Sequence, residues 1–164
     1  MIDESIFREY DIRGIVPVQL NELSVKAIAK AIAIKCNNEL VDEVALGRDG
    51  RLSGGNLLKS LSSELQSRGI NVFNIGIVTS PLLYFAAKKI KSKSGIMITG
   101  SHNPKDYNGF KIVINDSPVS GTEILSLLSN EPLRVNSPGR ELIKKDLMDE
   151  YVDEVCSQAI KNAK

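Results

Sequence analysis

The chain has 164 residues, of which 42% are hydrophobic and 25% are charged, and its formal net charge is +1. These are the proportions of an ordinary globular protein, so we expect residues 1–164 to form one domain with its own core. A nearly neutral charge gives no reason to expect nucleic acid or membrane as a partner. No apolar run is long enough to span a bilayer and the N-terminus lacks a signal-peptide pattern, so we expect a cytoplasmic protein.

Helical and strand-like patterns alternate through the first half of the chain. Residues 23–37 predict a helix with only a narrow polar stripe, which should be buried around much of its circumference. Residues 44–46 predict a short buried strand that ends at a turn over residues 47–54. Four leucines at helical spacing in residues 57–65 predict a second helix, and Gly69 is its expected stop.

The same alternation continues to the C-terminus. Residues 71–77 predict a strand, and Ser80 and Pro81 predict the N-cap and first residue of the next helix. A short helix is expected after Gly121, and a longer one from about Leu142 onward. On the last helix, Leu147, Tyr151 and Val155 are expected to share a face. Residues 136–139 are the best candidate for a linker. The alternation is typical of a layered α/β fold.

Residues 97–112, MITGSHNPKDYNGFKI, are the most informative segment. An apolar run over residues 95–99 predicts a buried strand, and residues 110–114 alternate with the period of a half-buried strand. Ser101 therefore lies in a polar loop between two strands, among glycine, asparagine and proline residues that favour turns. Lys111 points away from the core-facing residues and can lean over the loop. A hydroxyl among backbone N–H groups, with a cation nearby, is suited to hold a phosphoryl group, although an ordinary surface turn has the same composition.

Two further motifs, together with this loop, carry a family resemblance. They are Ile6-Phe7-Arg8-Glu9-Tyr10-Asp11-Ile12-Arg13-Gly14 and Gly47-Arg48-Asp49-Gly50-Arg51-Leu52-Ser53-Gly54. In this order, the three motifs resemble the N-terminal domain of the phosphohexomutases, in the phosphomannomutase/phosphoglucomutase branch. The resemblance implies a three-layer α/β/α fold with a mixed β-sheet. It also implies that domains II–IV are absent from this chain, so that the isolated domain is inactive.

The activity that the resemblance implies is the interconversion of hexose 6-phosphate and hexose 1-phosphate, through a phosphoserine and a bisphosphorylated sugar. Ser101 would carry the phosphoryl group and, through its phosphate, bind Mg²⁺. The other metal ligands would lie in the absent second domain, because no DGDxD motif occurs here. Glucose or mannose 1,6-bisphosphate would serve as activator and intermediate. The implied partners are the hexose phosphate substrate and the remaining domains of the same chain.

The resemblance also assigns roles to individual residues. Arg13 offers a permanently charged donor fork for phosphate oxygens, and Lys111 is the better acid/base of the two because arginine hardly ever loses its proton. Tyr10 would shape the cleft wall and contact substrate. His102 and Asn103 would support the phosphoserine as its neighbours, with His102 counted among the catalytic residues and Asn103 among the substrate-binding residues.

Some residues keep a structural interpretation beside a functional one. Arg48 and Arg51 could guide phosphate from a distance, but a turn held by Asp49 and Ser53 is the simpler interpretation. Tyr10 and Arg13 could pack together as a purely structural pair. The acidic residues of the last helix, from Asp146 to Glu154, are interpreted as a solvated face and not as a metal site. Cys36 and Cys156 are interpreted as reduced thiols with neither a disulfide nor a metal role.

Two alternative functions remain open. One is a phosphoglucosamine mutase domain, although those enzymes usually open with a motif nearer FGTDGIRG and carry alanine where this chain has Gly100. The other is a non-catalytic module that binds a phosphosugar. A serine hydrolase is excluded because the chain has no GxSxG motif and His102 adjoins Ser101 directly. The preference between mannose and glucose, the pathway, the oligomeric state and the phosphorylation state of Ser101 are not encoded in these patterns.

Overall fold

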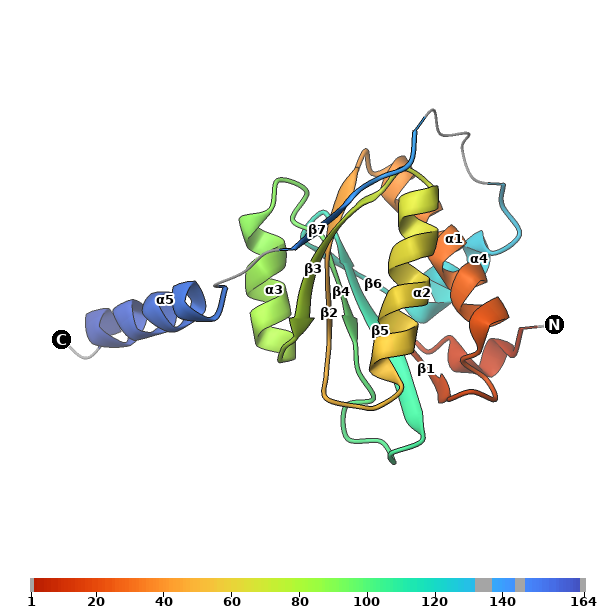
Figure 1. Ribbon diagram of the computed structural model, residues 1–164, viewed down its shortest axis with the longest axis horizontal. Coiled ribbons are helices and arrows are strands. Elements are labelled where there is room, and N and C mark those ends of the chain that lie inside the picture. The colour runs from red at the N-terminus through yellow and green to blue at the C-terminus, as the bar shows by residue number, and fades with distance from the viewer. Residues whose placement is uncertain (1, 132–136, 144–146, 163–164) are drawn as a thin grey trace.

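A computed structural model describes residues 2–131, 137–143 and 147–162 (Figure 1). In chain order, the helices and strands are η1 (Glu4–Ile6), β1 (Ile12–Ile15), α1 (Glu22–Asn38), β2 (Glu43–Arg48), α2 (Gly54–Ser67), β3 (Asn71–Ile77), α3 (Ser80–Lys89), β4 (Gly95–Ile98), β5 (Tyr107–Ile114), β6 (Ser117–Val119), α4 (Gly121–Leu127), β7 (Glu141–Ile143) and α5 (Leu147–Asn162).

The strands form one mixed sheet in the order β1-β5-β4-β2-β3-β7, with β6 paired to the end of β5. Strands β7, β3, β2 and β4 run parallel to one another. Strand β5 is antiparallel to β4, and β1 is antiparallel to β5. In Figure 1, α1, α2 and α4 lie on one side of the sheet and α3 lies on the other. The expected three-layer α/β/α fold with a mixed sheet is therefore confirmed.

Two apolar clusters fill the space on the two faces of the sheet. Val44 and Leu46 of β2 belong to the larger cluster, with α1 and α2, whereas Ala45 between them belongs to the cluster under α3. Strand β4 alternates in the same way, with Ile96 on one face and Met97 on the other. Successive side chains of a strand point to opposite faces, so a strand covered on both faces is apolar at every position. This is why residues 95–98 form a continuous apolar run.

Local sequence signals explain where several helices begin and end. The side chain of Asn21 accepts hydrogen bonds from Leu23 N and Ser24 N, while the Ser24 side chain caps Asn21 N in return. This reciprocal capping satisfies backbone donors that the first helical turn leaves free. Gly69, with φ of +83°, follows the end of α2 as expected. The cap of α3 is Thr79 and not the predicted Ser80, which is already helical.

The predicted helix from Leu142 is wrong in its first residues. Glu141–Ile143 instead form β7, an edge strand parallel to β3. Val72 N donates to Arg140 O at 2.8 Å, and Asn74 Nδ2 donates to Glu141 Oε1 at 2.8 Å. The free edge of β3 supplies these partners, and the sequence around Leu142 contains no sign of them. Leu147 and Tyr151 of α5 pack beside α3, whereas Val155 is half exposed.

The predicted linker over residues 136–139 begins outside the described residues, at Asn136. Its last residue is packed against the domain, because Gly139 N donates to Gln66 O at 2.8 Å. A Cβ on Gly139 would lie 2.1 Å from the Ile70 carbonyl oxygen, so only glycine fits at this position. The described end of this segment is thus part of the domain.

Both cysteines carry free thiols. Cys36 is fully buried in α1, and burial raises the pKa of its thiol to about 12, which keeps it protonated and unreactive. Cys156 is exposed on α5. Across the described ranges, no helix combines the length and the apolarity that a bilayer crossing requires.

The core generates a stability prediction. Leu61→Ala should lower the free energy of unfolding by about 2–5 kcal/mol, because Leu61 of α2 is fully buried in the larger apolar cluster and its truncation leaves a cavity. The matched control is Leu52→Ala, since Leu52 is fully exposed and its loss should cost less than about 0.5 kcal/mol. Urea unfolding followed by circular dichroism measures both. Similar losses for the two variants would contradict the packing of α2 on the sheet.

Candidate functional site

Two loops follow the carboxyl ends of the adjacent strands β2 and β4, at the same end of the sheet. Arg48 of β2 pairs with Ile98 of β4 at the end of a parallel ladder, so the chain exits both strands at the same place. We call residues 49–53 the arginine loop and residues 99–106 the serine loop. They lie together at the lower end of Figure 1. In α/β proteins, ligands bind at the carboxyl ends of parallel strands, which makes this edge the candidate site.

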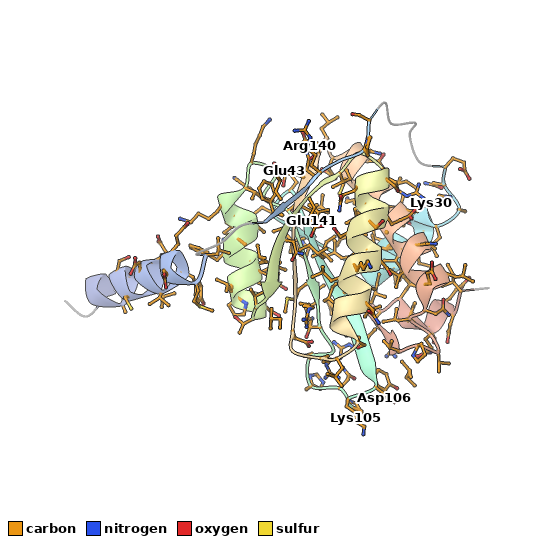
Figure 2. All side chains as sticks on the ribbon, in the orientation of Figure 1. Lys30, Glu43, Lys105, Asp106, Arg140 and Glu141 are labelled. Carbon is orange, nitrogen blue, oxygen red and sulfur yellow. The ribbon has the colours of Figure 1, made fainter. Side chains whose placement is uncertain are left out.

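The serine loop projects beyond the sheet. Lys105 and Asp106 lie at its tip, at the opposite end of the molecule from Glu43 and Arg140 (Figure 2). Loops that carry functional residues are usually exposed in this way while a rigid scaffold fixes their bases. The base of this loop is fixed by the β4–β5 pairing, since Thr99 N donates to Gly109 O at 3.0 Å.

Ser101 has an unusual backbone conformation. Its φ of +51° lies in the left-handed region, which non-glycine residues rarely adopt. Its backbone N–H donates to Thr99 Oγ1 at 2.9 Å, and the residue is exposed. Such a conformation costs roughly 1–3 kcal/mol and persists only where surrounding contacts enforce it. The loop therefore holds the Ser101 hydroxyl toward solvent at an energetic cost.

Asp49 of the arginine loop anchors the beginning of the serine loop. Its Oδ2 accepts hydrogen bonds from Thr99 Oγ1 at 2.8 Å and from Gly100 N at 3.2 Å. Its Oδ1 accepts from Arg51 N at 3.0 Å, which shapes its own turn. Hydrogen bonds to an ionised carboxylate are stronger than those between neutral groups. Asp49 thus connects to Ser101 N through the hydroxyl of Thr99.

The two arginines of this region differ in reach. Arg48, the last residue of β2, bonds to its neighbour in the chain, since its Nη1 donates to Asp49 O at 3.0 Å. Arg51 crosses to the serine loop and donates to several of its carbonyls. The predicted turn held by Asp49 is confirmed, but Ser53 caps no backbone group and instead accepts from Asn108 Nδ2 at 2.9 Å.

His102 and Asn103 follow Ser101 in the loop. His102 Nδ1 lies 3.3 Å from Ser101 Oγ, so either group can be the donor according to the imidazole tautomer. Asn103 closes the loop on itself, because both its backbone N and its Nδ2 donate to Gly100 O, at 3.0 and 2.9 Å. Asn103 therefore stabilises the turn in which Ser101 lies.

A second group of charges lies on β1 and β5. Arg13 Nη2 and Lys111 Nζ both contact Asp11 Oδ2, at 2.5 and 3.2 Å. The Asp11 side chain is only 7% exposed, so this carboxylate is almost completely shielded from water. Among the described residues, no hydrogen bond joins Ser101 to Arg13 or Lys111. The two cations are brought together by Asp11 rather than by the serine.

A hollow of about 500 Å³ lies beside these groups. It is lined by Arg8, Glu9, Tyr10, Asp11, Arg13, Asn103, Pro104 and Tyr107. Tyr10, which is 79% exposed, thus faces the same space as Arg13 and the serine loop. The hollow brings together three residues that the sequence singled out, Tyr10, Arg13 and Asn103.

The described residues offer few ligands for a metal ion. In the ranges that the structure describes, no three histidine, cysteine, aspartate or glutamate residues are placed to share one. The Asp49 carboxylate is engaged by Thr99, Gly100 and Arg51. Of the described acidic residues on α5, Asp149, Glu150, Asp153 and Glu154 are all exposed, as the sequence predicted.

Sequence reasoning missed Asp11, Thr99 and the anchoring role of Arg51. Asp11 directly precedes β1 and lies two residues before Arg13, so a period-two analysis of residues 11–15 could have placed both side chains on one face. Thr99 carried no such signal, because its role depends on a partner 50 positions earlier in the chain.

Comparisons with known proteins agree with this fold and loop arrangement. Residues 4–130 match the family described as phosphoglucomutase/phosphomannomutase, alpha/beta/alpha domain I. The chain is 41% identical over 157 residues to a phosphoglucomutase from Neisseria meningitidis serogroup B, covering 94% of this chain and 34% of that protein. It is also 41% identical over 158 residues to a phosphomannomutase/phosphoglucomutase from Pseudomonas putida, again with 94% and 34% covered.

A solved structure gives the same result. The crystal structure of a phosphoglucomutase/phosphomannomutase family protein from Burkholderia thailandensis superposes with a TM-score of 0.82 at 34% identity. The match covers 93% of this chain and 35% of that one. This chain therefore spans about a third of the length of the relatives that it matches. The match over residues 4–130 and these identities show that the chain belongs to the phosphoglucomutase/phosphomannomutase family.

Proposed function

We propose that Ser101 is the phosphoryl carrier of a mutase that interconverts hexose 6-phosphate and hexose 1-phosphate. The observation that carries the proposal is the strained backbone of Ser101, whose φ of +51° keeps an exposed hydroxyl at the carboxyl edge of the sheet. Family membership supports it, and so do Arg13 and Lys111, which Asp11 holds together. An ordinary surface turn would not require a serine at positive φ together with a pair of anchored cations.

The rest of the active site would come from outside this chain. The relatives are about three times longer, so we propose that further domains of the same polypeptide complete the cleft and select the sugar. Mg²⁺ would be held by an oxygen of the Ser101 phosphoryl group together with ligands from those domains, because the described residues group no further ligands around Ser101. When bound, the ion would neutralise charge on the transferring group.

The chemistry is a transfer between two oxygen atoms. A sugar hydroxyl attacks the phosphorus on phosphorylated Ser101, so that a new O–P bond forms while the Oγ–P bond breaks. The hydroxyl gives its proton to Lys111 Nζ as Nζ passes one of its own to Asp11 Oδ2, which lies 3.2 Å away. Ser101 Oγ gains a proton from His102, whose Nδ1 lies 3.3 Å away. The bisphosphorylated sugar then turns around and returns its other phosphoryl group to Ser101. Glucose or mannose 1,6-bisphosphate would prime the same cycle.

Asp11 gives the two cations a common anchor. Because Arg13 Nη2 and Lys111 Nζ contact the same oxygen, both side chains are positioned before substrate arrives. Preorganised charges of this kind stabilise a transition state without further reorganisation. Arg13 would hold phosphoryl oxygens with its remaining N–H groups, since its planar fork suits them. Tyr10 would contact the sugar from the wall of the hollow.

Replacing Ser101 tests the proposal. In the full-length protein, Ser101→Ala should lower mutase kcat by at least ~10³-fold, because the phosphoryl acceptor is removed. The melting temperature should stay nearly constant, because the hydroxyl is exposed and alanine tolerates a positive φ no better than serine. The control is Ser126→Ala, on an exposed serine of α4. Retention of most activity would remove Ser101 from its role.

A double-mutant cycle tests the Asp11 anchor. Lys111→Met should lower kcat by roughly 10²–10⁴-fold, with a smaller effect on KM. Asp11→Asn, which keeps the shape and removes the charge, should cost roughly 10–100-fold, as is typical of a group that orients a functional side chain. Because part of the Asp11 effect passes through Lys111, the double variant should lose less than the product of the two losses. Fully multiplicative losses would mean that Asp11 does not act through Lys111.

A further inference from the structure

Every N–H group of the Arg51 guanidinium faces an acceptor of the protein, and most of these acceptors are carbonyls of the serine loop. Its Nη1 donates to Pro104 O at 2.5 Å and to Tyr107 O at 3.0 Å. Its Nη2 donates to Ser101 O at 3.1 Å and to Asn103 O at 2.7 Å. An arginine has five N–H groups, and the fifth, on Nε, faces Asp49 Oδ2 at 3.4 Å.

This saturation excludes one interpretation of Arg51. With four N–H groups on carbonyls and the fifth facing a carboxylate, no donor is left for a phosphate oxygen. The side chain is also only 16% exposed. Arg51 is therefore not a distant guide for phosphate, which was one of the two possibilities that the sequence left open.

Gly100 allows the guanidinium to lie against the loop backbone. A Cβ at this position would be 2.3 Å from both Cζ and Nε of Arg51. A side chain on Gly100 would therefore clash with the Arg51 guanidinium, and glycine at this position leaves room for it. Three carbonyls of the serine loop, and that of Tyr107 at the start of β5, consequently point toward one planar group on the neighbouring loop.

The Ser101 peptide is fixed from both sides. Its carbonyl accepts from Arg51 Nη2, and its N–H donates to Thr99 Oγ1, which Asp49 holds in turn. With both ends of the residue bonded, the backbone has little freedom to leave its positive φ. The direction of the Ser101 side chain follows from that backbone angle.

We propose that Arg51 is a positioning residue that keeps Ser101 in its left-handed conformation and so aims its hydroxyl at the transferring phosphoryl group. Arg51 touches neither substrate nor phosphorus and acts only through the loop. The catalytic part of this inference rests on the proposed function, whereas the conformational part does not. Arg51→Lys is the decisive substitution, because lysine keeps the positive charge but cannot reproduce the planar group of five donors. Its effect therefore reports the geometry of the hydrogen bonds and not the charge.

The test compares Arg51→Lys and Arg51→Gln with the matched control Arg48→Lys, which alters the arginine at the end of β2 that donates to Asp49 O. In this chain, NMR measures the intraresidue HN–Hα nuclear Overhauser cross-peak of Ser101. This cross-peak is strong only at positive φ, where the two protons lie close together. We expect both Arg51 variants to weaken it and the control to retain it. In the full-length protein, both Arg51 variants should lower kcat by roughly 100-fold with KM changed less than about threefold, as expected for a misplaced reacting group.

Adding methylguanidinium to Arg51→Ala provides a second measurement, since a free guanidinium can occupy the vacated position and should restore part of the kcat and the cross-peak. If Arg51→Lys keeps both the cross-peak and kcat, the proposal is wrong. If the cross-peak weakens but kcat does not fall, Arg51 only shapes the loop and the proposal is equally overturned. If Ser101→Ala remains active, the proposed function fails, while the NMR result still decides whether Arg51 holds the conformation.

Discussion

The hydrogen bonds between the arginine loop and the serine loop are the constraint on which the site depends. Asp49 holds the start of the serine loop through Thr99 and Gly100, and Arg51 holds its carbonyls. Parallel pairing of β2 with β4 brings the two loops to the same end of the sheet. The side chains of Asp49 and Arg51 then fix the conformation of the serine loop. This arrangement holds an exposed serine at positive φ, a backbone conformation that is energetically unfavourable for serine.

A second constraint concerns charge. Arg13 and Lys111 come from strands that pair antiparallel, and each would repel the other without the carboxylate of Asp11 between them. Because Asp11 is shielded from water, its attraction for both cations is weakened little by solvent or salt. In the proposed function, the hydroxyl on one loop and the two anchored cations on β1 and β5 would together form this domain's share of the active site. This is consistent with a chain that spans about a third of its relatives.

The sequence predicted the features that depend on local pattern. Helix α1 follows from its narrow polar stripe, and Ser101 and Lys111 from a loop between two strand patterns. It did not predict features that depend on distant partners. Asp11 binds Lys111 from 100 positions away, and β7 replaces the predicted start of the last helix because β3 offers it a free edge. A single sequence shows no signal for such pairings, whereas the family resemblance identified residues but not the bonds that hold them.

Mapping the phosphoryl group is the most direct test of the central claim. The full-length protein is incubated with glucose 1,6-bisphosphate carrying labelled phosphate, digested with trypsin and analysed by mass spectrometry. The account predicts label in one peptide, Ser94–Lys105, with fragmentation assigning it to Ser101 and not to Ser94 or Thr99. Label on any other residue, or a turnover-competent protein that takes up no label, would contradict it.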